Sequence, residues 1–194
     1  MSPVINAMED WHLSDQATSS KGQKSCQLTS EHQSVRFQLG TSLRTRFGAS
    51  CFEKGVDAPR RNLDFDITDQ EEVHSKLLEI DSWVLDYITQ NSERLLKKKI
   101  TRAEVESAYT PLVRQYGAGS SCKTKINLRG LRACTFWNEE GEEIKAPDDG
   151  TWTEFAYDVF VAIPQLWIMQ GTYGLLLETT ALRITQPSAK NPFL

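Results

Sequence analysis

The fold is decided by the stretch from Cys122 to Thr185, which reads CKTKINLRGLRACTFWNEEGEEIKAPDDGTWTEFAYDVFVAIPQLWIMQGTYGLLLETTALRIT. Runs rich in β-branched and aromatic residues occupy 123–127, 133–137, 155–163, 166–169 and 173–184. Turn residues separate these runs, among them Gly141, Gly150, Pro164 and Gly171. Several short strands between turns predict a small antiparallel barrel or sandwich.

The run 155–163 shows the clearest alternation of residue types. One face carries Phe155, Tyr157, Val159, Val161 and Ile163. This face is expected to point into the core. Phe160 lies on the opposite face, where it is either a second packing contact or part of a binding surface.

Upstream of this stretch, two strands and a long helix are predicted. The strands cover 35–39 and 62–67, where apolar and polar residues alternate. The helix covers 69 to about 89, with Thr68 or Asp69 as its cap. Its apolar stripe consists of Val73, Leu77, Ile80, Val84 and Tyr87.

Further helical structure is expected before the strand-rich stretch begins. A turn or two covers 91–99, and the capping box Thr101–Glu104 opens a third helix that ends before Pro111. Gly117–Ser121 is expected to be a flexible link. Helices between early and late strands indicate the α+β class.

The chain is predicted to contain one folded domain between two tails. Residues 1–33 lack sustained periodicity and are expected to be a disordered N-terminal tail. Residues 34–186 form the domain, with a helical insertion at about 69–112, and 187–194 form a C-terminal tail.

Composition indicates an ordinary soluble protein. The 194 residues are 39% hydrophobic and 25% charged, with a net charge of −4. No apolar run reaches the length of a membrane span, and the N-terminus lacks a signal-peptide pattern. Four widely spaced cysteines favour reduced thiols over a disulfide framework or a zinc site, which predicts an intracellular protein.

The sequence offers little for catalysis. It has three histidines and no P-loop, G-x-G-x-x-G, G-x-S-x-G or H-E-x-x-H pattern. The cluster Glu139, Glu140, Glu142 and Glu143 surrounds Gly141 in a predicted hairpin turn, where charged side chains face water. We therefore expect a protein that is not an enzyme and that has no cofactor, metal or small-molecule substrate.

Charge is strongly segregated along the chain. Between Arg94 and Arg132 there are ten basic residues and two acidic ones, whereas 135–160 contains eight acidic residues and one lysine. A second basic group lies between Arg36 and Arg61. Positive tracks interleaved with aromatic rings are typical of surfaces that bind single-stranded nucleic acid, because phosphates need cations and unstacked bases need ring faces.

The candidate binding residues follow from this pattern. The basic candidates are Arg44, Arg46, Arg60, Arg61, Lys97, Lys98, Lys99, Lys123, Lys125, Arg129 and Arg132. The aromatic candidates are Phe47, Phe52, Trp137, Trp167 and Tyr173. The alternative interpretation is that the basic residues are solvated and the rings fill the core.

A resemblance to a known family supports the first interpretation. The succession of motifs comprises Phe47-Gly48, 62–67, 77–81, 91–93 with Lys97–Lys99, 109–113 and 123–126, followed by a closing hairpin at 166–169 and Tyr173-Gly174. Over about residues 35–185 this order resembles the single-stranded-DNA-binding proteins of large DNA viruses. The chain departs from that pattern at Arg46, where the family has an apolar residue or proline, and at Leu95 and Leu96, where it has an aromatic.

The resemblance implies an OB-like antiparallel β-barrel with a helical insertion between early and late strands. It also implies a protein that coats single strands during DNA replication or repair, in the nucleus or at a cytoplasmic replication site. Single-stranded DNA is the expected partner, and the sequence does not distinguish it from single-stranded RNA. Replication proteins are further candidate partners. Binding to a membrane is not expected.

Our primary hypothesis is therefore a non-catalytic single-stranded-DNA-binding protein. The alternative is a protein-interaction or assembly module, in which the acidic edge 139–158 contacts a basic partner. Convergence of the basic residues on one concave face that bears aromatic rings would favour the first hypothesis.

Overall fold

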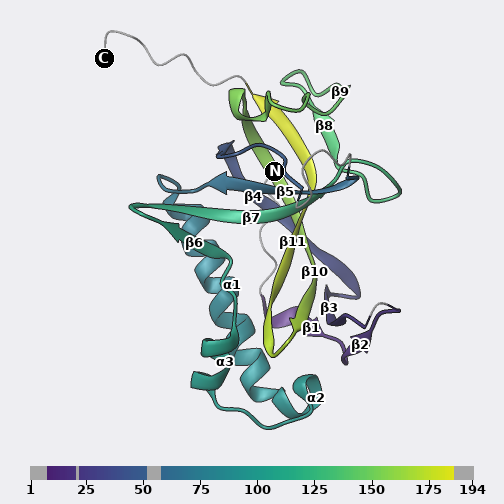
Figure 1. Ribbon diagram of the computed structural model, residues 1–194, viewed down its shortest axis with the longest axis vertical. Coiled ribbons are helices and arrows are strands. Elements are labelled where there is room, and N and C mark those ends of the chain that lie inside the picture. Colours follow the sequence, from purple (N-terminus) through teal and green to yellow (C-terminus); the bar gives the residue numbers. More distant parts are fainter. Residues whose placement is uncertain (1–7, 21, 52–57, 186–194) are drawn as a thin grey trace.

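The computed structural model describes residues 8–20, 22–51 and 58–185, and these form a sheet-rich fold with a few helices (Figure 1). The N-terminal half contains η1 (Met8–Asp10), β1 (Trp11–Leu13), β2 (Ala17–Thr18), β3 (Lys24–Ser30), β4 (Gln33–Thr45), β5 (Arg60–Asp66) and α1 (Glu71–Gln90). The remainder contains α2 (Ser92–Leu96), α3 (Arg102–Ala108), β6 (Val113–Tyr116), β7 (Gly119–Asn127), β8 (Thr135–Trp137), β9 (Glu143–Ile144), η2 (Trp152–Glu154), β10 (Ala156–Met169) and β11 (Thr172–Thr185). The predicted mixture of strands and helices is confirmed.

The central feature of the sheet is a closed ring of strands. In order around the ring, β4 pairs with β5, β5 with β7, β7 with β11, β11 with β10, and β10 again with β4. The β7–β11 pairing is parallel, and the others are antiparallel. Closure leaves no free edge within the ring, and the inward side chains of all five strands share one core.

The long strand β10 explains much of this geometry. Tyr157, Val159, Val161 and Ile163 of the predicted core face are fully buried, whereas Phe155 is only partly buried. On the opposite face, Ala156, Asp158 and Ala162 are also buried. The predicted strands 155–163 and 166–169 are one strand, with a register shift between Ala162 and Gln165. Pro164 lies in this shift because it has no N–H for the ladder, so the strand bends there without ending.

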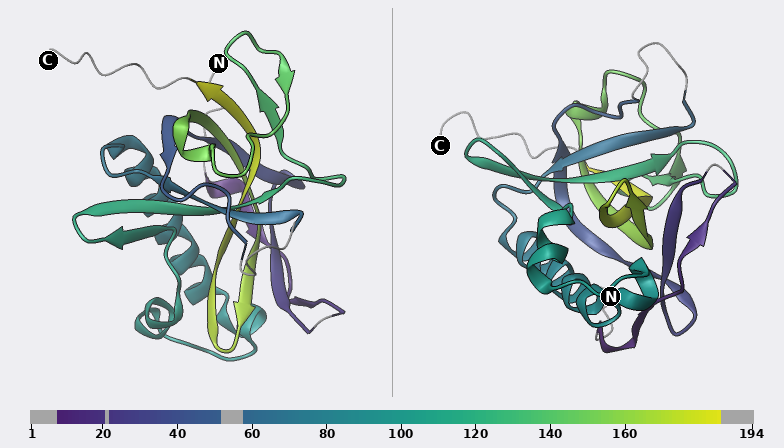
Figure 2. Two further views of the ribbon diagram at one scale, coloured as in Figure 1. Left: turned by 45° about the horizontal axis from the view of Figure 1, so that its top comes forward. Right: turned by 60° about the horizontal axis from the view of Figure 1, so that its bottom comes forward.

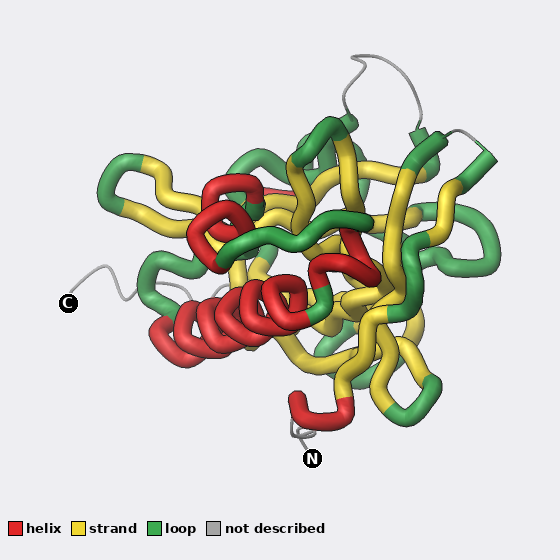
Figure 3. The backbone as a smooth tube through the Cα atoms, turned by 90° about the horizontal axis from the view of Figure 1, so that it is seen from below, coloured by secondary structure: helices red, strands yellow, loops and turns green. Residues whose placement is uncertain are grey.

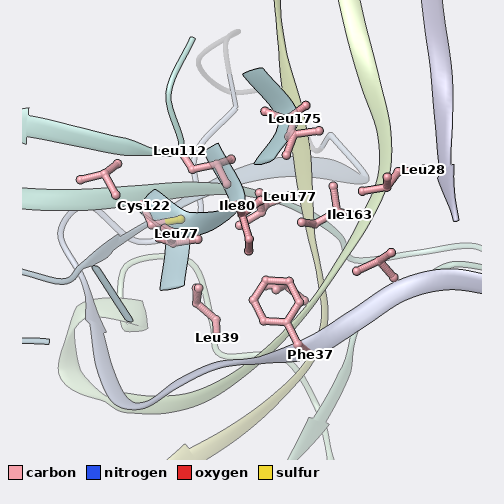
Figure 4. Packing of buried hydrophobic residues seen from close by; sticks show 14 of the residues in the cluster. Leu28, Phe37, Leu39, Leu77, Ile80, Leu112, Cys122, Ile163, Leu175 and Leu177 are labelled. Atoms are coloured by element: carbon pink, nitrogen blue, oxygen red, sulfur yellow. The ribbon is translucent and has the colours of Figure 1, made fainter. Parts of the chain in front are cut away.

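The helices pack against one side of the ring (Figure 3). Four members of the predicted stripe of α1 are buried, Val73, Leu77, Ile80 and Val84, whereas Tyr87 is only partly buried and Ile88 is buried instead. Figure 4 shows Leu77 and Ile80 in the same core as Phe37 of β4. The helices therefore extend the core of the ring.

The two helix caps have different outcomes. The predicted capping box of α3 is confirmed: the Glu104 N–H donates to the Thr101 hydroxyl, and the Thr101 N–H donates to the Glu104 carboxylate at 2.7 Å. The predicted cap of α1 is wrong, because Gln70 is the N-cap and makes no side-chain cap bond. The Thr68 hydroxyl is instead bonded to Asp66 at 2.6 Å.

The N-terminal segment requires a correction. The expected disordered tail 1–33 is wrong for 8–20 and 22–30, where β1 pairs with β3 and β3 pairs with β10. Trp11 is buried and contacts Trp83 of α1 edge-to-face, with ring centroids 5.3 Å apart. β1 and β2 are too short to show a period, and the seven-residue β3 has only two alternating apolar residues, Cys26 and Leu28, so the sequence pattern missed all three strands.

The expected flexible link at Gly117–Ser121 is also wrong. Residues 113–116 form β6, which pairs with β7 in a tight hairpin. Gly117 lies at the turn with φ of 58°, a conformation that glycine adopts without steric cost. The predicted C-terminal tail at 187–194 lies outside the described residues.

None of the helices in the described part of the chain combines the length and the apolar character needed to cross a bilayer.

Candidate nucleic-acid interface

The outer face of β5 and β7 carries a strip of basic side chains. The register places Arg60 opposite Asn127, Asn62 opposite Lys125, and Asp64 opposite Lys123. Arg114 of β6 lies next to Ser121 on the same face. We call Arg60, Arg114, Lys123 and Lys125 the basic strip.

The cations of the basic strip are close enough to affect one another. The pKa of Lys125 is lowered first by partial burial and then by the charges of Lys123, Arg60 and Arg114. Its ammonium donates a hydrogen bond to the Asn62 side-chain oxygen. A concentration of positive charge that costs free energy in the unbound protein is relieved when an anion binds across it.

Beside the basic strip lie two neighbouring open cavities of about 640 and 400 Å³, which have lining residues in common. They share Leu131, Arg132, Pro164, Gln165 and Glu178. The described side chains that line the two cavities include the arginines Arg36, Arg60, Arg129 and Arg132 and the single carboxylate Glu178. We call the two cavities together the arginine groove.

The shape of the arginine groove follows from small residues on the outer face of the ring. Ala162 of β10 and Thr180 and Ala181 of β11 line the larger cavity, as does Ala133 of the β7–β8 loop. The register shift of β10 at Pro164 lies in the wall of both cavities. The bend and the short side chains together leave the hollow.

Glu178 connects the basic strip to the arginine groove. It accepts a hydrogen bond from Asn127 at 2.6 Å and pairs with Arg60 at 3.5 Å. Arg60 belongs to both the basic strip and the arginine groove, so the two adjoin as one predominantly positive surface, on which Asp64 and Glu178 are the interspersed carboxylates. Arg60, Lys123, Lys125, Arg129 and Arg132 are thus the predicted basic residues that the structure brings together.

Two predicted tryptophans border this surface. The Trp137 indole N–H donates to the Thr135 hydroxyl at 3.0 Å, and Thr135 lines the larger cavity. Trp167 is half-buried two residues beyond Gln165 on β10, and its ring packs on Gly174. Neither tryptophan lines a cavity, but each lies two residues along its strand from a residue that does, Thr135 for Trp137 and Gln165 for Trp167.

The other predicted aromatics have different surroundings. Tyr173 is buried, and its hydroxyl donates to the Val105 carbonyl at 2.9 Å, which makes it a core residue. Phe47 is 71% exposed in the loop after β4. Phe52 lies outside the described residues.

Three predicted arginines lie at the ends of β4 and β5. The Arg46 guanidinium pairs with Asp66 at 3.2 Å and lies over the Tyr116 ring. Arg44 is exposed on β4. Arg61 is buried, pairs with Asp149 and donates to the Ala58 carbonyl, so it joins a loop to the ring.

Lys97, Lys98 and Lys99 do not join the positive surface. All three are exposed at the C-terminal end of α2. Figure 1 shows α2 at the end of the molecule opposite β8 and β9, away from β5 and β7. These three lysines are adjacent in the sequence, but this adjacency does not show how far they lie from the groove in the fold.

Several residues of the surface were missed as site residues. Arg36 alternates with the buried Val35 and Phe37, so its outward direction was readable from the sequence. Arg114 belongs to β6, which the sequence pattern did not reveal. Leu131 gave no signal, because an isolated leucine in a predicted loop is uninformative.

Four acidic residues gather on the hairpin that follows the groove residue Thr135, and one of them, Glu143, pairs with Trp137. The β8–β9 hairpin carries Glu139, Glu140, Glu142 and Glu143, all exposed, as expected for a solvated turn. Figure 2 shows this hairpin projecting from the ring on the side away from α1. Within the described ranges, no group of three or more His, Cys, Asp or Glu side chains is arranged to hold a metal ion.

No family model matches the chain, and no curated protein matches it. Among solved structures, it is similar to a single-stranded DNA-binding protein from bacteriophage Enc34 in complex with ssDNA, at 11% identity and a TM-score of 0.48, over 91% of this chain and 96% of that chain. It is also similar to gp2.5, a single-stranded DNA binding protein encoded by bacteriophage T7, at 12% identity and a TM-score of 0.49, over 80% of this chain and 96% of that one. Similarities at this level establish neither a family nor a ligand for the chain, and the resemblance to proteins of large DNA viruses stays a prediction.

Proposed function

We propose that this protein binds single-stranded nucleic acid, DNA in the first place, without catalysing a reaction. The observation that carries the proposal is the predominantly positive surface formed by the basic strip and the arginine groove on the outside of a closed five-stranded ring. Phosphates would contact the arginines and lysines, and bases would stack on Trp137 and Trp167 at the ends of the groove.

We further propose that the ring is an OB-type barrel. The OB-fold is a five-stranded Greek-key barrel that binds oligonucleotides on its second and third strands. In chain order, the second and third strands of this ring are β5 and β7, and these strands carry the basic strip. The helices α1–α3 then form an insertion between those two strands.

The composition of the surface favours a strand with accessible bases over a folded acidic protein. The groove alternates arginines with small apolar and hydroxyl side chains and has tryptophans at its borders. A duplex presents phosphates but hides its base faces, so it could use only the charges. Coating of single strands in replication or repair is the role that this selectivity would serve.

The proposal is tested by fluorescence anisotropy with labelled oligonucleotides at low salt. We expect the single-stranded DNA to bind more tightly than a duplex of the same length. An RNA strand of the same sequence shows whether the protein prefers deoxyribose or ribose. Replacing Trp137 with Leu should weaken binding roughly five- to hundredfold if its ring stacks on a base. A folded protein that binds none of these probes would contradict the proposal and would favour the assembly-module alternative.

A further inference from the structure

Leu131 is the most exposed large apolar side chain in the described part of the chain. Its relative exposure is 109%, and it lies in the β7–β8 loop between Arg129 and Arg132. A single exposed leucine on a protein surface is common and needs no explanation by itself. This one differs because it lines both cavities of the arginine groove.

The loop that carries Leu131 is held at several points by backbone hydrogen bonds. The Leu128 N–H donates to the Pro59 carbonyl at 2.7 Å, and the Cys134 N–H donates to the Asn127 carbonyl at 2.7 Å. Between these bonds, the Ala133 N–H donates to the Gly130 carbonyl at 3.0 Å and closes a turn. Gly130 has φ of 92°, which a residue with a side chain rarely adopts. The turn therefore fixes the backbone of Leu131 at the rim of the groove.

The neighbours of Leu131 supply the remaining contacts that a nucleic-acid strand would need. Arg132 lines both cavities, and Arg129 lines the smaller one. Each cavity has a volume in the range of small-molecule sites. Leu131 is an apolar side chain that lines both cavities, with Arg129 and Arg132 on either side of it in the chain. Leucine side chains of this kind are known to insert between base steps of duplex DNA, and the same insertion would separate stacked bases of a single strand.

We propose that Leu131 is an apolar wedge that enters between two neighbouring bases of the bound strand, so that one base occupies each cavity. The inference rests on the proposed function and adds to it a residue that separates bases at a fixed point of the interface. The flanking arginines hold the phosphates on either side of the opened step.

The test uses a single-stranded deoxyoligonucleotide in which one adenine, flanked by adenines, is replaced by 2-aminopurine. Stacking quenches the fluorescence of this base, so opening of a base step raises it. Wild-type protein should raise the fluorescence on binding, and Leu131→Ala should abolish most of that rise. Affinity should fall about tenfold, while the dependence on salt stays unchanged because no phosphate contact is lost.

Leu78→Ala is the matched control, because Leu78 is also exposed, at 48%, but lies on α1. It should bind and unstack the probe like wild type. Leu131→Met should keep most of the fluorescence rise, since it retains an apolar side chain of similar volume. Thermal unfolding of all three variants shows whether they are folded.

Two results would overturn the inference, and they are distinguishable. If Leu131→Ala binds the probe as tightly as wild type with the same rise in fluorescence, the wedge is wrong and the proposed function stands. If folded wild-type protein does not bind the probe at all, the proposed function and the wedge both fail.

Discussion

Among the carboxyl groups in the described part of the chain, that of Asp81 has the most strongly shifted pKa. It is buried in α1, where it accepts hydrogen bonds from the Tyr109 hydroxyl at 2.6 Å and the Leu112 N–H at 3.0 Å. Burial raises the pKa of the Asp81 carboxyl from 3.8 to about 6, although both hydrogen bonds act in the opposite direction. Asp81 thus joins α1 to the segment between α3 and β6. Because burial disfavours the charged carboxylate, its contribution to the free energy of unfolding depends on pH.

The sign of this pH dependence follows from the two pKa values. Because the folded value is higher than the unfolded one, the stability that Asp81 contributes is fully present below pH 3.8 and is lost as pH rises through about 6. The difference between the two pKa values corresponds to a loss of roughly 3 kcal/mol in the free energy of unfolding at neutral pH, relative to acidic pH.

Asp81→Asn should remove this dependence while keeping an acceptor for Tyr109 and Leu112. The free energy of unfolding of the variant, relative to wild type, should rise by roughly 2–3 kcal/mol between pH 4 and pH 7. Urea denaturation across this range measures it. Glu79→Gln, an exposed change on the same helix, is the control. Parallel profiles for Asp81→Asn and wild type would show that the carboxyl is not perturbed.

At the scale of elements, the long helix α1 depends on its apolar stripe. Ile80 is fully buried between the helix and the ring (Figure 4). Ile80→Ala should lower the free energy of unfolding by roughly 2–5 kcal/mol, because it leaves a cavity in a packed core. The exposed Leu78→Ala should change it by less than about 0.5 kcal/mol. Equal unfolding midpoints for the two variants would contradict the assignment of the core-facing stripe.

Most of the elements that could be predicted are long enough to show a period; the three-residue β8 was found from its β-branched and aromatic residues, and the seven-residue β3 was missed. β10 and α1 were readable because alternation and helical spacing persist over many residues. β1, β2, β6 and β9, with two to four residues each, offer no such pattern. Their positions are fixed by pairing with longer strands, which is a tertiary property.

The same reasoning explains which parts of the candidate site were predictable. Lys123 and Lys125 alternate with buried residues on a predicted strand, so their outward direction followed from the sequence. The arginine groove could not be predicted, because Arg36 and Arg132 are distant in sequence and line one cavity only when the ring closes. The run Lys97–Lys99 was the strongest local signal, yet it belongs to the helical end of the molecule.

At the scale of the whole molecule, positive and negative charge occupy different parts of one domain. The arginine groove and the basic strip lie on the outside of the ring, and the acidic β8–β9 hairpin projects beyond it (Figure 2). A net charge of −4 would repel a polyanion at long range, so the proposed binding would depend on this local positive surface. The position of each cation should therefore matter more than the total charge.

The central claim is tested most directly by the salt dependence of binding to single-stranded DNA. The variant Arg36→Gln/Arg132→Gln removes two charges from the arginine groove, and Lys97→Gln/Lys98→Gln removes two charges from the end of α2. Each phosphate contact contributes a slope of about −0.7 to log K against log salt. We predict that the groove variant binds more weakly, with a slope flatter by roughly 1.4, and that the lysine variant keeps the wild-type slope. Equal slopes for the groove variant and wild type, or a change in the lysine variant alone, would contradict the account.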